Sequence, residues 1–302
     1  MKPDKASYQE LIDQAFNNKK LFFKPWIGEY YGKGVKLFNS KHQFKIMVIG
    51  ASRYCEYIAN GNPCSYESDC CKCNDYDKMK SIADNCSYLN IIKASDSSCK
   101  GLRLYDINTA CLRKSCNGNP FEAYKNFQSF MATFLNSNNP KEIWNYLSFV
   151  NAYEPIVPRG QKKRTPPYLD FKNEYKKSGR VIATEIDILE PDIIFLWQSE
   201  QIYAALDDLF PQKKDIKIEP YNYRTKHPYN SYDINGIRLL TIPHPTFSKK
   251  DYVDYIDYIN RSKTIMMCEF VTPYTINNTL FFSNPLEDIY NELEEYVNTL
   301  ND

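Results

Sequence analysis

The chain has 302 residues, of which 43% are hydrophobic, a size and composition that can bury a substantial core and that exclude an intrinsically disordered protein. Its 38 Lys and Arg balance 37 Asp and Glu, and the formal net charge of +1 excludes a global basic field that would attract nucleic acid or an anionic membrane. Any such attraction has to be local.

The amino-terminal sequence indicates in which cellular compartment the protein is expected. The first residues, MKPDKASYQELIDQ, contain no apolar h-region of the kind found in secretory signals. No uninterrupted apolar run reaches the roughly 20 residues that a bilayer-spanning helix needs. We therefore expect a cytoplasmic protein with no membrane partner.

Two elements are predicted before residue 55. A capping-box pattern from Ser7 to Glu10 precedes apolar residues at helical spacing, which predicts a short amphipathic helix with Leu11, Ile12, Ala15 and Phe16 on one face. The run FKIMVIG at 44–50 is compact, apolar and ended by glycine. It predicts a core strand buried on both faces, as parallel strands in layered α/β proteins are.

Residues 55–118 are interpreted as a cysteine-rich insertion with little core of its own, because nine of the 10 cysteines lie there. In a reducing cytosol, clustered cysteines are more often metal ligands or free thiols than disulfides. Candidate ligands for a structural zinc ion or an iron–sulfur cluster are Cys64, Cys70, Cys71, Cys73 and Cys86. No pair of CxxC motifs is present, so free thiols or a few disulfides stay open as alternatives.

Helical periodicity returns after residue 118. Asn119-Pro120 predicts the start of a helix carrying Phe121, Tyr124, Phe127, Met131 and Phe134. The same cap and proline at Asn139-Pro140 predict another helix, with Ile143, Trp144 and Leu147. Residues 148–155 are then expected to run from this helix into the end of a strand.

A polar loop with a dense basic cluster follows at 158–167, PRGQKKRTPP. Its cations are candidates for contacts with nucleic-acid phosphates: Arg159, Lys162, Lys163 and Arg164. A solvated loop without a partner is the alternative.

The second half of the chain alternates helices and strands. Helices are predicted at 171–189, after Ser199, around Val253 to Ile259 and at 286–300. Strands are predicted at 192–197 and 237–242, with a possible edge strand at 279–282. Alternation of this kind predicts right-handed crossovers and a mainly parallel sheet covered by helices. We therefore expect an α/β fold of three layers, αβα, in a single domain over 1–302, with a C-terminal extension at 262–302.

Polar residues follow several of the predicted strands. Ligands of open parallel sheets bind outside the carboxyl ends of the strands. If the sheet forms as predicted, Ser52, Arg53, Tyr54, Asn151 and His244 converge at one end of it.

Four segments resemble the uracil-DNA glycosylase superfamily in type and in order. They are a strand ending in GASRYC, the segment FVNAY, a PDIIFLW strand and a strand ending in PHPTFS. The corresponding elements of that family are a strand ending in GQDPYH, an apolar segment ending in Asn, a central strand after a proline, and an HPS motif. The resemblance covers about residues 44–260 without the cysteine-rich insertion.

The resemblance implies a role for each matching residue. Gly50 would let the backbone approach the substrate, Tyr54 would wall the base pocket and Asn151 would recognise the Watson–Crick edge of a flipped base. His244 would stabilise negative charge on the departing base, and Ser52 would stand where water is positioned. Arg53 would add to a local basic rim beside the phosphates. The implied activity is hydrolysis of the N-glycosidic bond of a damaged or modified base in DNA, which requires no cofactor.

Two positions depart from the family pattern, since Ser52 stands in place of an Asp that activates water and Cys55 in place of a His. One alternative is therefore an inactive module that binds a nucleobase, nucleotide or nucleic acid on the same fold, and another is a metal-stapled interaction protein. Each of these residues also has a purely structural interpretation. Tyr54 could cover the edge of the sheet, Asn151 could be an ordinary turn or cap residue, and His244 could form a rigid turn between two prolines.

Overall fold

The computed structural model describes residues 5–18, 20–21, 25–38, 40–55, 119–134, 140–158, 171–198, 202, 204–218, 230–245 and 285–300. Several predictions lie outside these residues. They concern the cysteine-rich insertion after Cys55, the basic loop from Arg159 onward, the helix cap at Ser199, the helix around Val253 and the edge strand at 279–282.

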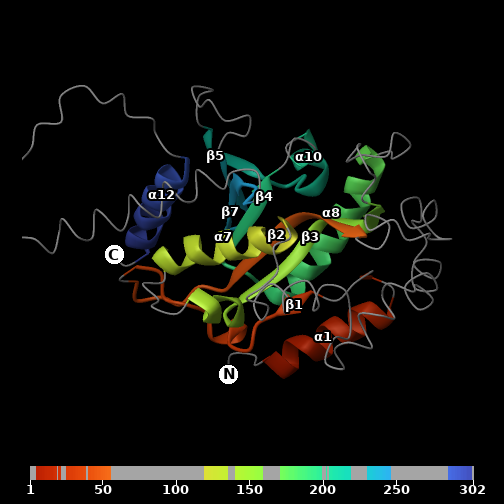
Figure 1. Ribbon diagram of the computed structural model, residues 1–302, viewed down its shortest axis with the longest axis horizontal. Coiled ribbons are helices and arrows are strands. Elements are labelled where there is room, and N and C mark those ends of the chain that lie inside the picture. The colour runs from red at the N-terminus through yellow and green to blue at the C-terminus, as the bar shows by residue number, and fades with distance from the viewer. Residues whose placement is uncertain are drawn as a thin grey trace, which may run out of the picture.

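Within the described residues, seven strands form one mixed sheet in the order β1-β3-β2-β4-β7-β6-β5 (Figure 1). The strands are β1 (Trp26–Ile27), β2 (Ile46–Cys55), β3 (Leu147–Pro158), β4 (Ile193–Gln198), β5 (Lys214–Ile218), β6 (Asn230–Ile234) and β7 (Ile237–Pro243). The neighbours β3, β2, β4 and β7 run parallel, whereas β1, β6 and β5 pair antiparallel at the two sides. The predicted α/β class and parallel centre are confirmed.

Helices cover both faces of the sheet because successive strand residues point to opposite sides. On one face, Ile46, Val48 and Phe195 pack with residues of α7 (Asn119–Phe134) and α12 (Pro285–Thr299). On the other face, Met47 and Ile49 pack with residues of α8 (Phe171–Leu189) and α10 (Leu206–Leu209). The first face carries the large aromatic side chains of the core, and α7 lies across it (Figure 1). We call it the α7 face.

The first helix, α1 (Lys5–Asn17), follows the prediction for its segment. Its buried Ile12 and Ala15 pack in a smaller cluster with Tyr31 and with Val181 and Leu189 of α8. Leu11, predicted on the buried face, is 44% exposed. The hydrophobic side of α1 is therefore narrower than its sequence indicates.

The final helix, α12, is part of the core. Ile289, Leu293 and Val297 are fully buried in the cluster on the α7 face. Arg238 of β7 holds this helix, because its guanidinium lies 3.2 Å from Glu292 Oε1 and over the ring of Tyr296. The end of the chain thus packs on β7, even though it follows a long stretch outside the described residues.

The helix predicted from Asn139-Pro140 is wrong in its extent. A 3-10 helix, η2, spans Pro140–Asn145, and Leu147 belongs to β3. The backbone N–H of Gly28 donates to the carbonyl oxygen of Leu147 at 2.9 Å, and that of Tyr30 donates to Asn145 at 2.6 Å. Because these bonds pair the chain beside β1 with residues 145–147, the segment cannot continue as an α-helix.

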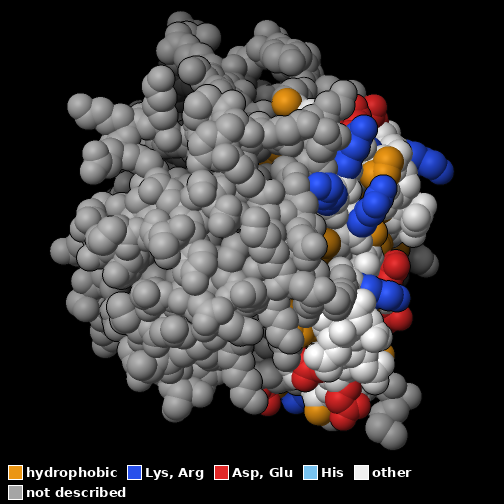
Figure 2. Space-filling view, turned by 90° about the vertical axis from the view of Figure 1, so that its right-hand side faces the viewer, with side chains coloured by type: hydrophobic (Ala, Val, Ile, Leu, Met, Phe, Trp, Pro, Cys, Tyr) orange, Lys and Arg blue, Asp and Glu red, His pale blue; other side chains and the backbone are white. Residues whose placement is uncertain are grey.

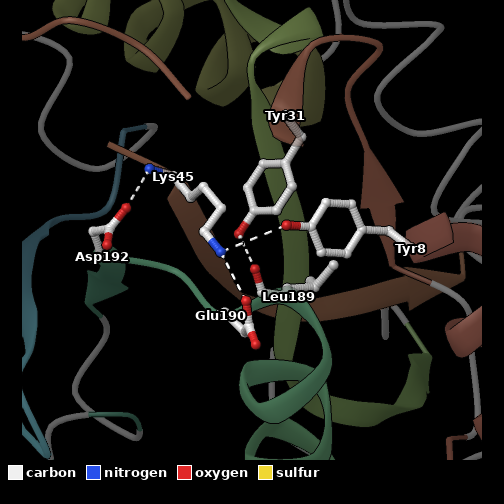
Figure 3. Close-up of polar contacts among 6 residues, drawn as sticks. All are labelled: Tyr8, Tyr31, Lys45, Leu189, Glu190 and Asp192. Carbon is white, nitrogen blue, oxygen red and sulfur yellow. Dashed lines mark hydrogen bonds and ion pairs between the residues drawn. The ribbon is translucent and has the colours of Figure 1, made fainter. Parts of the chain in front are cut away.

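Polar contacts tie the start of β2 to the turn between α8 and β4 (Figure 3). The backbone N–H of Lys45 donates to Asp192 Oδ2 at 2.7 Å, and its Nζ lies 3.1 Å from Glu190 Oε2. The hydroxyl of Tyr31 donates to the carbonyl oxygen of Leu189 at 3.2 Å. Burial raises the pKa of Tyr31, so this hydroxyl stays protonated as a donor. These contacts brace the amino ends of β2 and β4.

Glu190 in this turn has φ of +45°, a left-handed conformation that disfavours an L side chain by about 1 kcal/mol. Its carboxylate is 67% exposed, and an exposed ion pair such as the one with Lys45 contributes less than about 1 kcal/mol. We therefore expect Glu190→Gly to raise the free energy of unfolding by roughly 0.5 kcal/mol in urea titrations. The matched control is Lys45→Met, which removes the ion pair and keeps the turn. A larger loss of stability in Glu190→Gly than in Lys45→Met contradicts this expectation.

Candidate functional site

The strand order reverses between β2 and β4. From β2 the chain proceeds to β3 on one side, and β4 then pairs on the other side of β2. The β2–β4 ladder ends at Ile49 and Leu196, whereas the β2–β3 ladder continues as far as Cys55 and Pro158. Ligands of open α/β sheets bind at such switch points, beyond the carboxyl ends of the strands. Chemistry in this fold is therefore expected just past Ile49 and Leu196.

One glycine and three polar or aromatic residues gather at this end of the sheet on the α7 face. Gly50 pairs with Asn151 across β2 and β3, and each follows core residues of that face at alternate positions. Trp197 on β4 has its side chain in the same cluster, and the ring of His244 contacts it. We call Gly50, Asn151, Trp197 and His244 the carboxyl-end site.

Asn151 is 4% exposed, although an amide side chain is costly to bury. Its Oδ1 lies 2.8 Å from the point that a Cβ on Gly50 would occupy, and Cζ of Phe149 lies 2.6 Å from the same point. Only glycine leaves room at position 50 for both neighbours. The Asn151 amide is thus held against the backbone of β2, where the β2–β4 ladder has just ended.

The aromatic rings of Phe149, Tyr124 and Phe127 pack against Trp197 at the carboxyl-end site, and we call these four rings the aromatic floor. The Trp197 ring lies 5.4 Å from Phe149, 5.5 Å from Tyr124 and 5.3 Å from Phe127, centroid to centroid. Trp197 is 2% exposed, and among the described residues its indole Nε1 has no hydrogen-bond partner. These contacts hold the indole in one position, so the site rests on a rigid base.

His244 follows the last residue of β7 and stands between Pro243 and Pro245. Its imidazole meets the Trp197 ring edge to face, with centroids 5.7 Å apart and planes at 76°. The side chain is half-buried, which keeps one part of the ring accessible. Asn126 of α7 donates from Nδ2 to the carbonyl oxygen of Pro245 at 2.8 Å. Helix α7 therefore contacts the chain directly after the histidine.

The strand containing Ser52, Arg53 and Tyr54 is longer than predicted. The predicted strand ended at Gly50, but β2 continues to Cys55. The pairing with β3 shifts between Ser52 and Arg53, so that Glu154 and Pro155 of β3 are extra residues in a bulge. Bulges bend strands and are frequent next to active sites. The backbone of Ser52 pairs with Tyr153, two positions along the strands from the Gly50–Asn151 pair.

Three of the predicted site residues, Gly50, Asn151 and His244, thus lie at one end of the sheet and on one face. The candidate phosphate contacts Arg159, Lys162, Lys163 and Arg164 lie outside the described residues, as do the candidate metal ligands Cys64, Cys70, Cys71, Cys73 and Cys86. In the part of the chain that is described, no cluster of His, Cys, Asp or Glu could hold a metal ion. None of the helices described there is long and apolar enough to cross a membrane.

Charge is mixed on the described part of the face in Figure 2, where Lys and Arg side chains lie next to Asp and Glu side chains. Around α8 and α10, Lys213 lies 2.7 Å from Asp207 and Lys176 lies 3.9 Å from Asp208. Such pairing cancels much of the local field. A basic rim for phosphates is therefore not formed by these residues.

Trp197 of the carboxyl-end site and Asn126, which contacts the chain beside it, were not predicted as functional. Trp197 was interpreted only as the end of a buried strand, although a tryptophan at the carboxyl end of a parallel strand is a usable signal. Asn126 was passed over inside a helical pattern, where Asn is a poor helix former and therefore signals a specific contact.

A search of protein-family models finds no match to this chain, and a search of curated proteins finds none either.

Proposed function

We propose that the carboxyl-end site binds a nucleobase flipped out of DNA and that the protein hydrolyses its N-glycosidic bond, as a glycosylase of the uracil-DNA glycosylase type does. The observation that carries this proposal is the buried amide of Asn151, held over Gly50 and on the same sheet face as His244. An amide offers both a donor and an acceptor, which is what the Watson–Crick edge of a base requires.

The chemistry assigns a separate task to each residue. Water attacks the anomeric carbon as the bond to the base nitrogen breaks, and the electron pair of that bond leaves with the base. The proton that the water loses neutralises the departing base. A donor near a base oxygen stabilises the negative charge that develops there. His244 supplies that donor, while the flat base packs above the aromatic floor. Ser52 takes the place at which water is positioned.

A second function is favoured by one residue. Ser52 stands where the resembled family has the Asp that activates water, and a serine hydroxyl is a weak base without assistance. The second proposal is therefore a module that binds a nucleobase or a nucleic acid without cleaving it. Both functions use Asn151 and the aromatic floor, and they differ only in turnover.

The test uses oligonucleotides that carry uracil, hypoxanthine or another altered base, in single and double strands, with unmodified strands as the control. Abasic sites are detected by alkaline cleavage, and binding is measured by fluorescence anisotropy. If the protein is a glycosylase, abasic product forms from one altered base and not from the unmodified strand. Selective binding without product supports the module. If the protein forms no abasic product and binds no altered base selectively, both proposals are overturned.

Substituting His244 separates catalysis from binding. We expect His244→Ala to lower the single-turnover rate by about 10²- to 10³-fold, the usual effect of removing one donor from a developing anion. The dissociation constant for the altered strand should change far less. The matched control is His42→Ala, because His42 bonds the carbonyl oxygen of Leu300 at a distance from the sheet end. An equal rate in His244→Ala and in the wild type removes His244 from the mechanism.

A further inference from the structure

The segment that presents His244 has few backbone donors. Pro243 and Pro245 carry no N–H, so His244 supplies the one backbone donor of these three residues. The β4–β7 ladder ends at the pair Gln198 and Pro243, one residue before the histidine. Contacts from other elements therefore help to fix the position of the imidazole.

Asn126 of α7 provides that contact across 119 positions of sequence, from Nδ2 to the carbonyl oxygen of Pro245 at 2.8 Å. The same helix places Tyr124 and Phe127 against Trp197, whose indole meets the imidazole of His244. The backbone after His244 and the ring of His244 are thus held by one helix, the first directly and the second through Trp197.

The residue type argues for a dedicated role. Asn in a helix interior is about 0.6 kcal/mol less favourable than Ala, because its side chain competes for backbone hydrogen bonds. Asn126 lies in the middle of the 16-residue helix α7. A half-buried side chain at this position could be replaced by a better helix former if packing were its only task.

We propose that Asn126 is a positioning residue for His244: by holding the carbonyl oxygen of Pro245, it fixes the imidazole relative to the base that Asn151 holds. This inference rests on the proposed function. It assigns Asn126 no contact with the substrate, so its whole effect passes through His244.

A double-mutant cycle tests this route. Asn126→Ala should lower the single-turnover rate about 10-fold while changing the dissociation constant for the altered strand less than about 2-fold, as expected for a residue that acts after binding. In a His244→Ala background, Asn126→Ala should have no further effect on the rate. Asn126→Gln, which keeps a donor, should recover part of the rate. Lys125→Ala, a neighbouring change on the same helix, serves as the control.

A second readout needs no turnover. The chain has 3 histidines, so the imidazole signals of His244 can be assigned in NMR spectra by comparison with His244→Ala. Asn126→Ala should shift or broaden these signals, whereas Lys125→Ala should not. The inference is overturned if Asn126→Ala leaves the wild-type rate unchanged, if it lowers the rate equally in both backgrounds, or if the His244 signals do not change. Failure of the proposed function can be told apart from failure of this inference. In the first case the wild-type protein itself neither cleaves nor selectively binds an altered base. If the wild type binds without cleaving, the NMR spectra decide, and unchanged His244 signals in Asn126→Ala overturn the inference.

Discussion

Gly50→Ala is expected to abolish selective binding of the altered base and to lower the free energy of unfolding by about 1–3 kcal/mol, the usual cost of overpacking. The new methyl carbon would lie 2.6 Å from Cζ of Phe149 and 2.8 Å from Oδ1 of Asn151. Phe149 cannot move aside, because its ring is packed against Tyr124, Trp144 and Trp197. The Asn151 amide would therefore be displaced, and base recognition would be lost with it.

Phe149→Leu in the Gly50→Ala background separates crowding from other effects. The smaller side chain makes space for the new methyl group, so part of the lost stability should return in urea titrations, and the two changes should be strongly non-additive. Anisotropy with the altered strand then reports whether the amide has returned to its place. Wild-type affinity in Gly50→Ala alone would show that the close approach of β2 and β3 has no part in binding.

Asn151→Asp is the second substitution from which we expect a large effect. It should lower the affinity for the altered base, or the rate at which the bond to that base is hydrolysed, by at least about 100-fold. The variant keeps the shape of the side chain and replaces the amide donor with an acceptor. Asn151 is 4% exposed, so the change also places a carboxylate where water cannot solvate it well. A site built to bond a polar group discriminates strongly when one partner is replaced.

Stability has to be measured beside activity in this variant, because a buried carboxylate costs free energy of its own. Below the pKa of the carboxyl the group is neutral, and burial raises that pKa. The stability lost in Asn151→Asp should therefore return as the pH falls, whereas the affinity for the base should not return fully. Full recovery of binding at low pH would mean that the charge, and not the missing donor, weakens recognition.

The centre of the sheet could be predicted because β2, β4 and β7 each contain a short apolar run next to a glycine or proline: Gly50 follows the run of β2, Pro191 precedes that of β4, and Pro243 ends that of β7. Those runs are buried on both faces, so their hydrophobicity alone identifies them. The strands at the sides carry weaker signals. β1 has two residues, and three of the five residues of β5 (Lys214–Ile218) are charged.

The turn between β6 and β7 had a usable signal that we missed. Asn235 and Gly236 both have positive φ, 53° and 89°, as an Asn-Gly hairpin turn requires. Asn-Gly between two runs of strand-forming residues predicts an antiparallel pair, and this is what β6 and β7 form. The mixed character of the sheet could therefore have been inferred from this dipeptide.

At the carboxyl-end site, sequence order identified Gly50, Asn151 and His244 but not the neighbours that hold them. The contact between Asn126 and Pro245 joins residues 119 positions apart, and the approach of Phe149 to Gly50 depends on how β2 and β3 pair. Contacts of this kind arise from tertiary packing, for which periodicity within one segment contains no information.

The aromatic cluster on the α7 face belongs both to the hydrophobic core and to the floor of the carboxyl-end site. Divergence of substrate preference is therefore restricted, since a change to Trp197 or Phe149 that reshapes the floor also weakens the fold. In related chains that act on different ligands, we therefore expect the aromatic residues of the floor to persist.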